Sequence, residues 1–143
     1  MKHLVIIMML LSSVSLFGQV QNFNDIPKDL LENMDKMGID NSPLLNSYEG
    51  SYFNVIFAKY RGNFDFTNKK VGFILRGAIS DKKEYFEKER DRYIRGETPN
   101  SGQLRIFDID QKAESGGYDA AIVYWSKIAI PVEEVVKRLK KQQ

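Results

Sequence analysis

Hydrophobic residues follow two patterns along the chain. In KVGFILR (70–76) and YDAAIVYW (118–125) the apolar residues are nearly continuous, whereas in QLRIFDI (103–109) they alternate with polar ones. A short continuous run is typical of a strand covered on both faces, and alternation is typical of a strand with one covered face. The pattern therefore predicts three strands, the second of them near an edge, in a sheet with helices above and below it.

Three further segments have the spacing of amphipathic helices. Residues 24–38 repeat apolar side chains at helical intervals, and residues 80–96 begin at Ser80, which suits a helix cap, and end near Gly96. The C-terminal segment opens with Pro131 and places its valines and Leu139 on one face. Residues 80–96 are so rich in charge that we expect most of this helix to face solvent.

Residues 42–61 fit two interpretations. Ser42 followed by Pro43 is a typical helix start, whereas Gly50 and the composition of residues 52–57 are more typical of a strand. We favour a helix that ends at Gly62, because the aromatic and aliphatic residues of this segment fall on one helical face.

The predicted order of elements is α-α-β-α-β-β-α. This order indicates an α/β fold with a small, mostly parallel or mixed sheet of about three strands and helices on both faces. The link between residues 76 and 103 is long enough for a parallel crossover, whereas residues 110–117 form either one helical turn between parallel strands or the loop of an antiparallel hairpin.

The N-terminus has the pattern of a secretory signal peptide. A short polar start is followed by the apolar run 4–11 and then by small residues. The run is much shorter than the roughly 20 residues of a membrane-spanning helix. We therefore expect a signal peptide at residues 1–18, cleaved after Gly18 or alternatively after Ser15. A single domain of residues 19–143 would then be exported to the periplasm or the exterior, with no membrane span in the mature chain.

The composition excludes several chemistries. The chain contains no cysteine, and its one histidine, His3, lies within the predicted signal peptide. Catalysis by Ser-His-Asp or Cys-His groups, thiol redox chemistry and ordinary zinc or haem sites are therefore excluded for the mature chain. We predict no metal site and no cofactor.

The charge balance bears on possible partners. The net charge of the whole chain is +2, and loss of Lys2 with the leader would lower it to +1. Such a near-neutral balance argues against nucleic acid as a partner.

One candidate ligand site follows the first predicted strand. In the stretch LRGAIS, Arg76 and Gly77 precede the helix start at Ser80, and a helix N-terminus attracts anions. The glycine spacing of known phosphate-binding loops is incomplete here, and we favour a helix cap as the role of Ser80.

A second group of candidates surrounds the other strands. Asp108 and Asp110 follow the second strand, and Ser126 and Lys127 follow the third. The acidic stretch does not complete a calcium loop, because Lys112 occupies a ligand position, and we favour a solvated turn. If all three strands are parallel, these residues converge with Arg76, Gly77 and Ser80 at one edge of the sheet; if the last pair is antiparallel, they separate.

The leader ending LFGQ (16–19) and the stretches FDFTNKKVGFI (64–74) and SGGYDAAIVYWSK (115–127) resemble those of small uncharacterised exported proteins of Bacteroidota. This resemblance implies export but no particular fold, activity or site residue. Because no complete catalytic motif is present, we expect a non-enzymatic binding or protein-interaction module. The alternative is a small-anion-binding protein or a carboxylate-dependent hydrolase that uses residues at the carboxyl ends of the strands.

Overall fold

A computed structural model describes residues 42–58, 62–77, 79–95, 97, 102–124 and 128–143. The predicted signal peptide and the predicted helix at residues 24–38 lie outside these described residues. The described elements, in chain order, are α3 (Ser47–Ile56), β1 (Val71–Leu75), α5 (Lys82–Ile94), β2 (Gln103–Ile106), α6 (Ile109–Glu114), β3 (Ala120–Tyr124) and α7 (Val132–Lys140).

The three strands form a mixed sheet in the order β1-β3-β2. β1 and β3 are parallel, with Val71 opposite Ala120 and Leu75 opposite Tyr124. β2 runs antiparallel to β3, so that Ile106 at its end lies opposite Ala120 at the start of β3. The central position of β3 explains its continuous apolar sequence, because it is covered on both faces and paired along both edges.

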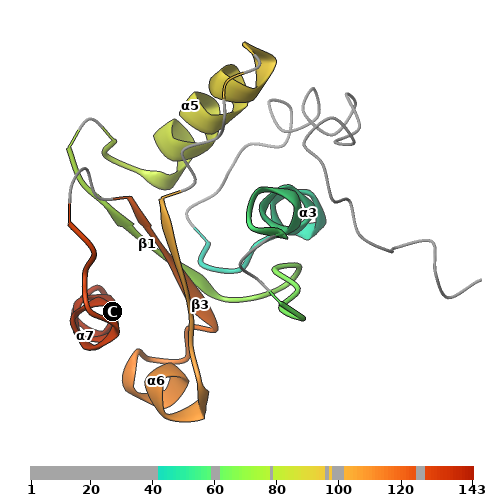
Figure 1. Cartoon of the computed structure of the whole chain (residues 1–143). Coiled ribbons are helices and arrows are strands. Elements are labelled where there is room, and N and C mark those ends of the chain that lie inside the picture. The colour runs from blue at the N-terminus through green and yellow to red at the C-terminus, as the bar shows by residue number, and fades with distance from the viewer. Residues whose placement is uncertain (1–41, 59–61, 78, 96, 98–101, 125–127) are drawn as a thin grey trace, which may run out of the picture.

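Helices cover both faces of this sheet, as the strand pattern predicts (Figure 1). On one face, α3 and α5 pack a largely aromatic cluster against β1 and β3, with Phe53 and Phe86 fully buried and their ring centroids 4.8 Å apart. On the other face, α7 packs Val135, Val136 and Leu139 against the sheet, and α6 lies beside α7. The predicted α/β fold class is therefore confirmed.

The connections settle two points that the sequence leaves open. The parallel partner of β1 is β3, so the segment that contains α5 does not join two neighbouring parallel strands. The segment between β2 and β3 forms the short helix α6, yet the strands that it joins are antiparallel. One short helix is too small to carry the chain back along the sheet, which parallel pairing would require.

Two helices begin later than their sequences predict. α3 begins after Asn46, whose side chain accepts the N–H of Glu49 while the Glu49 carboxylate accepts the N–H of Asn46. The residues before it are extended, and Leu44 forms a β-bridge with Lys70. At α5, Asp81 rather than Ser80 accepts the N–H of Glu84, at 2.7 Å. The Ser80 hydroxyl instead donates to the Glu84 carboxylate, at 2.9 Å.

Within the described residues, no helix is both long enough and apolar enough to cross a membrane.

Candidate functional site

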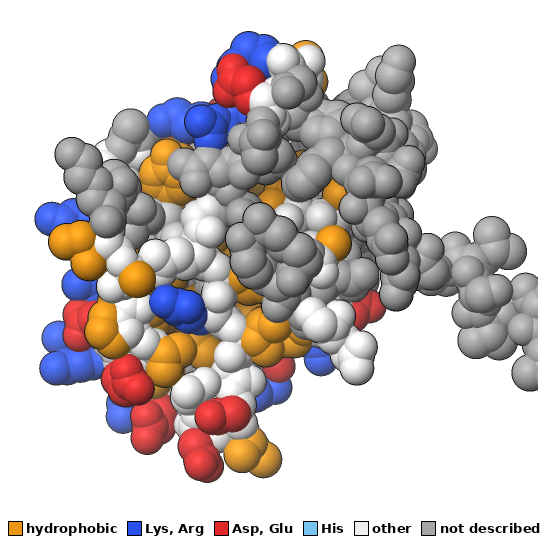
Figure 2. Space-filling view, in the orientation of Figure 1, with side chains coloured by type: hydrophobic (Ala, Val, Ile, Leu, Met, Phe, Trp, Pro, Cys, Tyr) orange, Lys and Arg blue, Asp and Glu red, His pale blue; other side chains and the backbone are white. Residues whose placement is uncertain are grey.

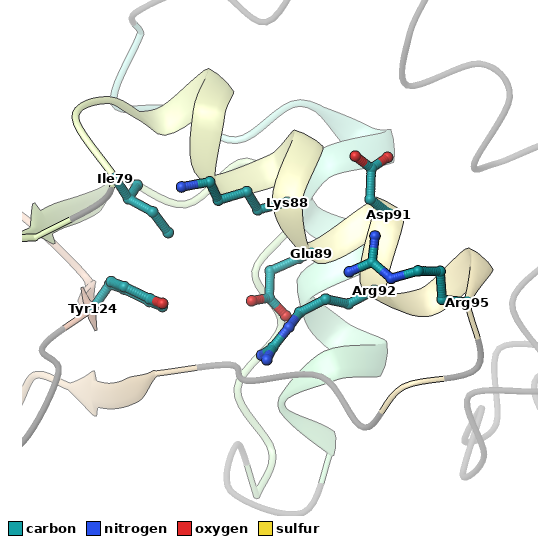
Figure 3. Close-up of a pocket in the computed structure, with 7 residues that line it drawn as sticks. All are labelled: Ile79, Lys88, Glu89, Asp91, Arg92, Arg95 and Tyr124. Atoms are coloured by element: carbon teal, nitrogen blue, oxygen red, sulfur yellow. The ribbon is translucent and has the colours of Figure 1, made fainter.

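A cavity of about 270 Å³ lies beside α5, beyond the carboxyl ends of the parallel strands (Figure 3). Ile79 reaches it from the segment after β1, and Tyr124 reaches it from the last position of β3. The crevice at this end of an α/β sheet is the usual place for a ligand. Four of the remaining lining residues come from α5 and the fifth, Arg95, directly follows it: Lys88, Glu89, Asp91, Arg92 and Arg95.

The helical spacing of α5 explains why these side chains meet. Lys88, Arg92 and Arg95 follow each other at intervals of four and three residues. Arg95 directly follows α5, but its N–H still donates to the Asp91 carbonyl, so the three side chains share one helical face. Glu89 lies four residues after Tyr85, a side chain that is fully buried against α3 and the sheet. The helix therefore presents three cations to the cavity and directs one carboxyl group towards the core.

Glu89 is unusual for a charged residue because it is buried at the cavity. The residue is 1% exposed, and its Oε2 atom has no hydrogen-bond partner among the described residues. Burial raises the pKa of Glu89 to about 7, although the charge of Arg92 opposes this shift. Figure 3 shows the hydroxyl end of Tyr124 directed towards the Glu89 carboxyl group. The cavity thus contains a carboxyl group that changes its charge near neutral pH.

The aromatic core supplies the low-polarity surroundings of Glu89. Tyr52 on α3 and Tyr85 on α5 are both buried, and burial followed by the nearby charge of Glu89 raises the pKa of each phenol. These tyrosines therefore stay neutral when Glu89 ionises and provide no compensating positive charge.

The cations at the cavity have acidic partners in neighbouring residues. Glu97 lies 2.6 Å from Arg95 and 3.5 Å from Arg92, and the hydrogen bond from Arg95 lowers the pKa of Glu97. Lys88 pairs with Glu84 at 2.9 Å, and this hydrogen bond, followed by those from Ser80, lowers the Glu84 pKa to about 2. These exposed pairs are weak in water, so an entering anion can compete with Glu97 and Glu84 for the cations.

The predicted candidate residues do not form one cluster. Arg76, Gly77 and Ser80 follow β1 and are exposed. Asp108 and Asp110 follow β2. Because β2 is antiparallel to β3, they lie at the opposite end of the sheet from the carboxyl ends of β1 and β3. Figure 2 shows acidic side chains gathered around α6, at the far end of the molecule from α5. Ser126 and Lys127 lie outside the described residues.

Asp108 has a clear structural role. Its carboxylate accepts the N–H of Gln111 at 2.8 Å, while the Gln111 side chain accepts the N–H of Asp108 at 3.1 Å, which forms a capping box at the start of α6. Asp110 is an exposed residue in the first turn of the same helix. Among the described residues, no group of three acidic or histidine side chains could hold a metal ion.

The cavity lies at the carboxyl ends of β1 and β3, where the sequence predicts a site, but other residues line it. The charge-rich sequence of α5 predicts a solvated helix, so Lys88, Glu89, Arg92 and Arg95 are not among the predicted site residues. A signal was nevertheless present: Glu89 is four residues from Tyr85 and three from Phe86, the two aromatic residues that anchor the buried face of the helix.

A second cavity, of about 170 Å³, offers less to a ligand. Lys82 is the one charged side chain among its described lining residues, and Glu49 already pairs with it at 3.2 Å.

The fold and the larger cavity define a small α/β domain with a mixed three-stranded sheet and a cation-lined pocket at one end of it. The chain belongs to the family described as Domain of unknown function (DUF8192), whose model matches residues 41–141. No curated protein and no solved structure matches the chain significantly.

Proposed function

We propose that the protein is an exported binding module that holds a small organic anion in the cavity beside α5. The observation that carries this proposal is the combination of three cationic side chains and a buried carboxyl oxygen without a described partner around one cavity of about 270 Å³. Lys88, Arg92 and Arg95 would attract and orient the anion. Ile79 and the ring of Tyr124 provide a wall for its less polar part.

The pattern of the leader supports the exported location. The apolar run at residues 4–11 is typical of a signal peptide, and the domain that would remain has no thiol to oxidise. Mass spectrometry of the protein secreted by expressing cells tests this part. A mature N-terminus at Gln19 or Leu16 supports it, and protein that retains Met1 in the cytosol would contradict it.

Calorimetry and thermal unfolding test the anion site directly. The probes are sulfate, citrate, glucuronate and AMP, which differ in shape and in the number of their charges. A probe at about ten times its dissociation constant stabilises the native state by roughly 1.4 kcal/mol, which raises the melting temperature by about 5 °C. If no probe raises the melting temperature at millimolar concentration, the proposal is wrong.

A charge-matched pair of variants locates the site. Lys88→Gln and Lys83→Gln each remove one positive charge from α5, but only Lys88 lines the cavity. We expect Lys88→Gln and Arg92→Gln to weaken the binding of the selected anion about tenfold, and Lys83→Gln to leave it within about twofold. Equal losses in all three variants would indicate a nonspecific charge effect instead of this cavity.

Carboxylate-dependent hydrolysis is a second candidate, because the pKa of about 7 suits Glu89 to general acid–base catalysis. The test is release of nitrophenol from nitrophenyl esters, phosphates and glycosides by the purified protein. Turnover that Glu89→Gln abolishes would support hydrolysis, and the absence of turnover for every substrate would leave the binding module as the function.

A further inference from the structure

The carboxyl group of Glu89 differs from the other charged groups around the cavity. The three cations reach the cavity from a partly exposed helix face, whereas Glu89 is 1% exposed and its Oε2 atom has no described partner. A buried polar atom without a partner is costly, so the site gains stability when a ligand supplies one. The chemistry of that missing partner depends on the protonation state of Glu89.

The groups around Glu89 come from three directions. Arg92 provides the positive charge that favours its ionisation, and the phenols of Tyr52 on α3 and Tyr85 on α5 are neutral. The other charged or titratable groups that line the cavity are Lys88 and Asp91 on α5, Arg95 directly after it, and Tyr124 on β3. Glu97 pairs with Arg92 and Arg95. Glu97 and Glu84 already pair with the three cations. The positive charge of the cations therefore does not fully balance an ionised Glu89.

We infer that the protonated carboxyl group of Glu89 donates a hydrogen bond to the bound anion, so that the anion and one proton bind together. This inference rests on the proposed function of the cavity and specifies its ligand: an anion with an oxygen that accepts a hydrogen bond. A neutral carboxyl group has one donor, whereas an ionised carboxylate has none and repels the anion. The proton remains on Glu89, and no covalent bond forms or breaks.

The coupling gives the binding constant a defined pH dependence. Only protein with protonated Glu89 is competent, and this fraction falls tenfold for each pH unit well above the Glu89 pKa of about 7. The apparent dissociation constant therefore rises roughly 50-fold between about pH 7 and about pH 9, and it is nearly constant below about pH 6. By reciprocity, the bound anion raises the pKa of Glu89.

A ligand that also carries a positive charge would show the opposite pH dependence of affinity. A zwitterion could place its ammonium group on an ionised Glu89 and its carboxylate on the arginines. The binding of such a ligand would become tighter as the pH rises through about 7, because ionised Glu89 would be the competent form. The direction of the pH dependence therefore distinguishes a hydrogen-bonded anion from a zwitterion.

The experiment is calorimetric titration of the wild-type protein at several pH values. The probes are sulfate and glucuronate, because neither changes its charge between about pH 6 and pH 9. Two buffers with different ionisation enthalpies measure the number of protons taken up for each anion bound. We expect an uptake that approaches one proton near pH 8, together with the loss of affinity described above.

Two variants separate Glu89 from other titrating groups. Glu89→Gln retains a side-chain donor without a titration, so it should bind at about pH 6 within roughly threefold of the wild type and lose the pH dependence. Glu87→Gln, on the exposed side of α5, should keep the pH dependence of anion binding. The carboxyl ¹³C shift of Glu89 provides a direct readout in the wild type, and its titration midpoint should rise when the anion is added.

The outcomes separate this inference from the proposed function. Anion binding that is independent of pH, or that strengthens as the pH rises, would overturn the coupling and leave the anion site in place. Absence of binding at every pH tested would overturn both.

Discussion

Lys82 of α5 and Glu49 of α3 form an ion pair in the interior of the domain. The Lys82 Nζ atom lies 3.2 Å from the Glu49 Oε1 atom, and the two side chains are 8% and 5% exposed. Lys82 also donates a hydrogen bond to the Ser42 carbonyl at 3.1 Å. Glu49 Oε1 has no aligned hydrogen-bond donor among the described residues, so the contact is an ion pair without a hydrogen bond at that atom. It links the two helices that cover the same face of the sheet.

We predict that Lys82→Met destabilises the domain strongly. The substitution leaves Glu49 buried without its counter-charge, which typically costs about 3–5 kcal/mol. Lys83→Met is the control, because Lys83 forms an exposed pair with Glu87 whose loss costs less than about 1 kcal/mol. Urea unfolding of both variants measures the difference. Similar stabilities for the two variants would show that the buried pair is not needed.

The double variant Lys82→Met/Glu49→Gln separates loss of the attraction from exposure of an unpaired charge. Because Glu49→Gln removes the buried charge, we expect the double variant to recover more than half of the stability that Lys82→Met loses. A double variant as unstable as the single one would mean that packing of Lys82 is responsible instead.

The strands and helices could be predicted because each carries its own hydrophobic period. The continuous apolar sequence of β3 indicates burial on both faces, and the structure places this strand at the centre of the sheet. The direction of β2 could not be predicted in this way, because alternation does not depend on whether the neighbouring strand is parallel or antiparallel. That single direction decides whether Asp108 and Asp110 join Arg76.

The start of α3 and the candidate site depend on tertiary contacts. Ser42 and Pro43 are a good local start signal, but the extended segment around Leu44 pairs with Lys70, and Asn46 caps the helix instead. Glu89 is one of many charged residues in α5, and it becomes exceptional only because α3 and the sheet bury it. Composition alone does not distinguish such a residue from its solvated neighbours.

Gly50 gives a prediction that contradicts helix propensity. Alanine is normally favoured over glycine in a helix by about 1 kcal/mol. A Cβ atom at Gly50 would lie 2.5 Å from the Thr67 Cα atom, so the helix or the neighbouring turn would have to move. We therefore expect Gly50→Ala to destabilise the domain by roughly 1–3 kcal/mol. Ser51→Ala, in the next position of α3, should change the stability by less than about 0.5 kcal/mol, as measured by thermal unfolding.

Asp108 and Asp110 should differ in their effect on stability. Asp108→Ala removes the N-cap of α6 and should cost about 1 kcal/mol. Asp110→Ala removes one favourable charge from the first turn and should lower the free energy of unfolding by only about 0.3 kcal/mol. Denaturant unfolding and amide exchange in α6 check this difference. Equal effects of the two variants would contradict the capping role of Asp108.

Glu89 should make the stability of the free protein depend on pH in an unusual direction. Its pKa is raised from about 4.5 to about 7 on folding, so between these values the native state binds more protons than the unfolded state. Stability from this group is therefore fully present below about pH 4.5 and is lost as the pH rises to about 7. After an allowance for screening by water in the cavity, the loss is roughly 2 kcal/mol.

Glu89→Gln tests this linkage because the amide has nearly the same shape and no charge. The variant should be more stable than the wild type by roughly 2 kcal/mol at about pH 8, and the difference should shrink as the pH falls towards about 5. Glu87→Gln, an exposed substitution on the same helix, should show no such pH-dependent gain. Guanidinium unfolding across this pH range measures both variants. Only a shifted pKa of Glu89 makes the two stabilities diverge as the pH rises. A difference in the free energy of unfolding between Glu89→Gln and the wild type that stays constant with pH would therefore mean that Glu89 titrates normally in the folded protein.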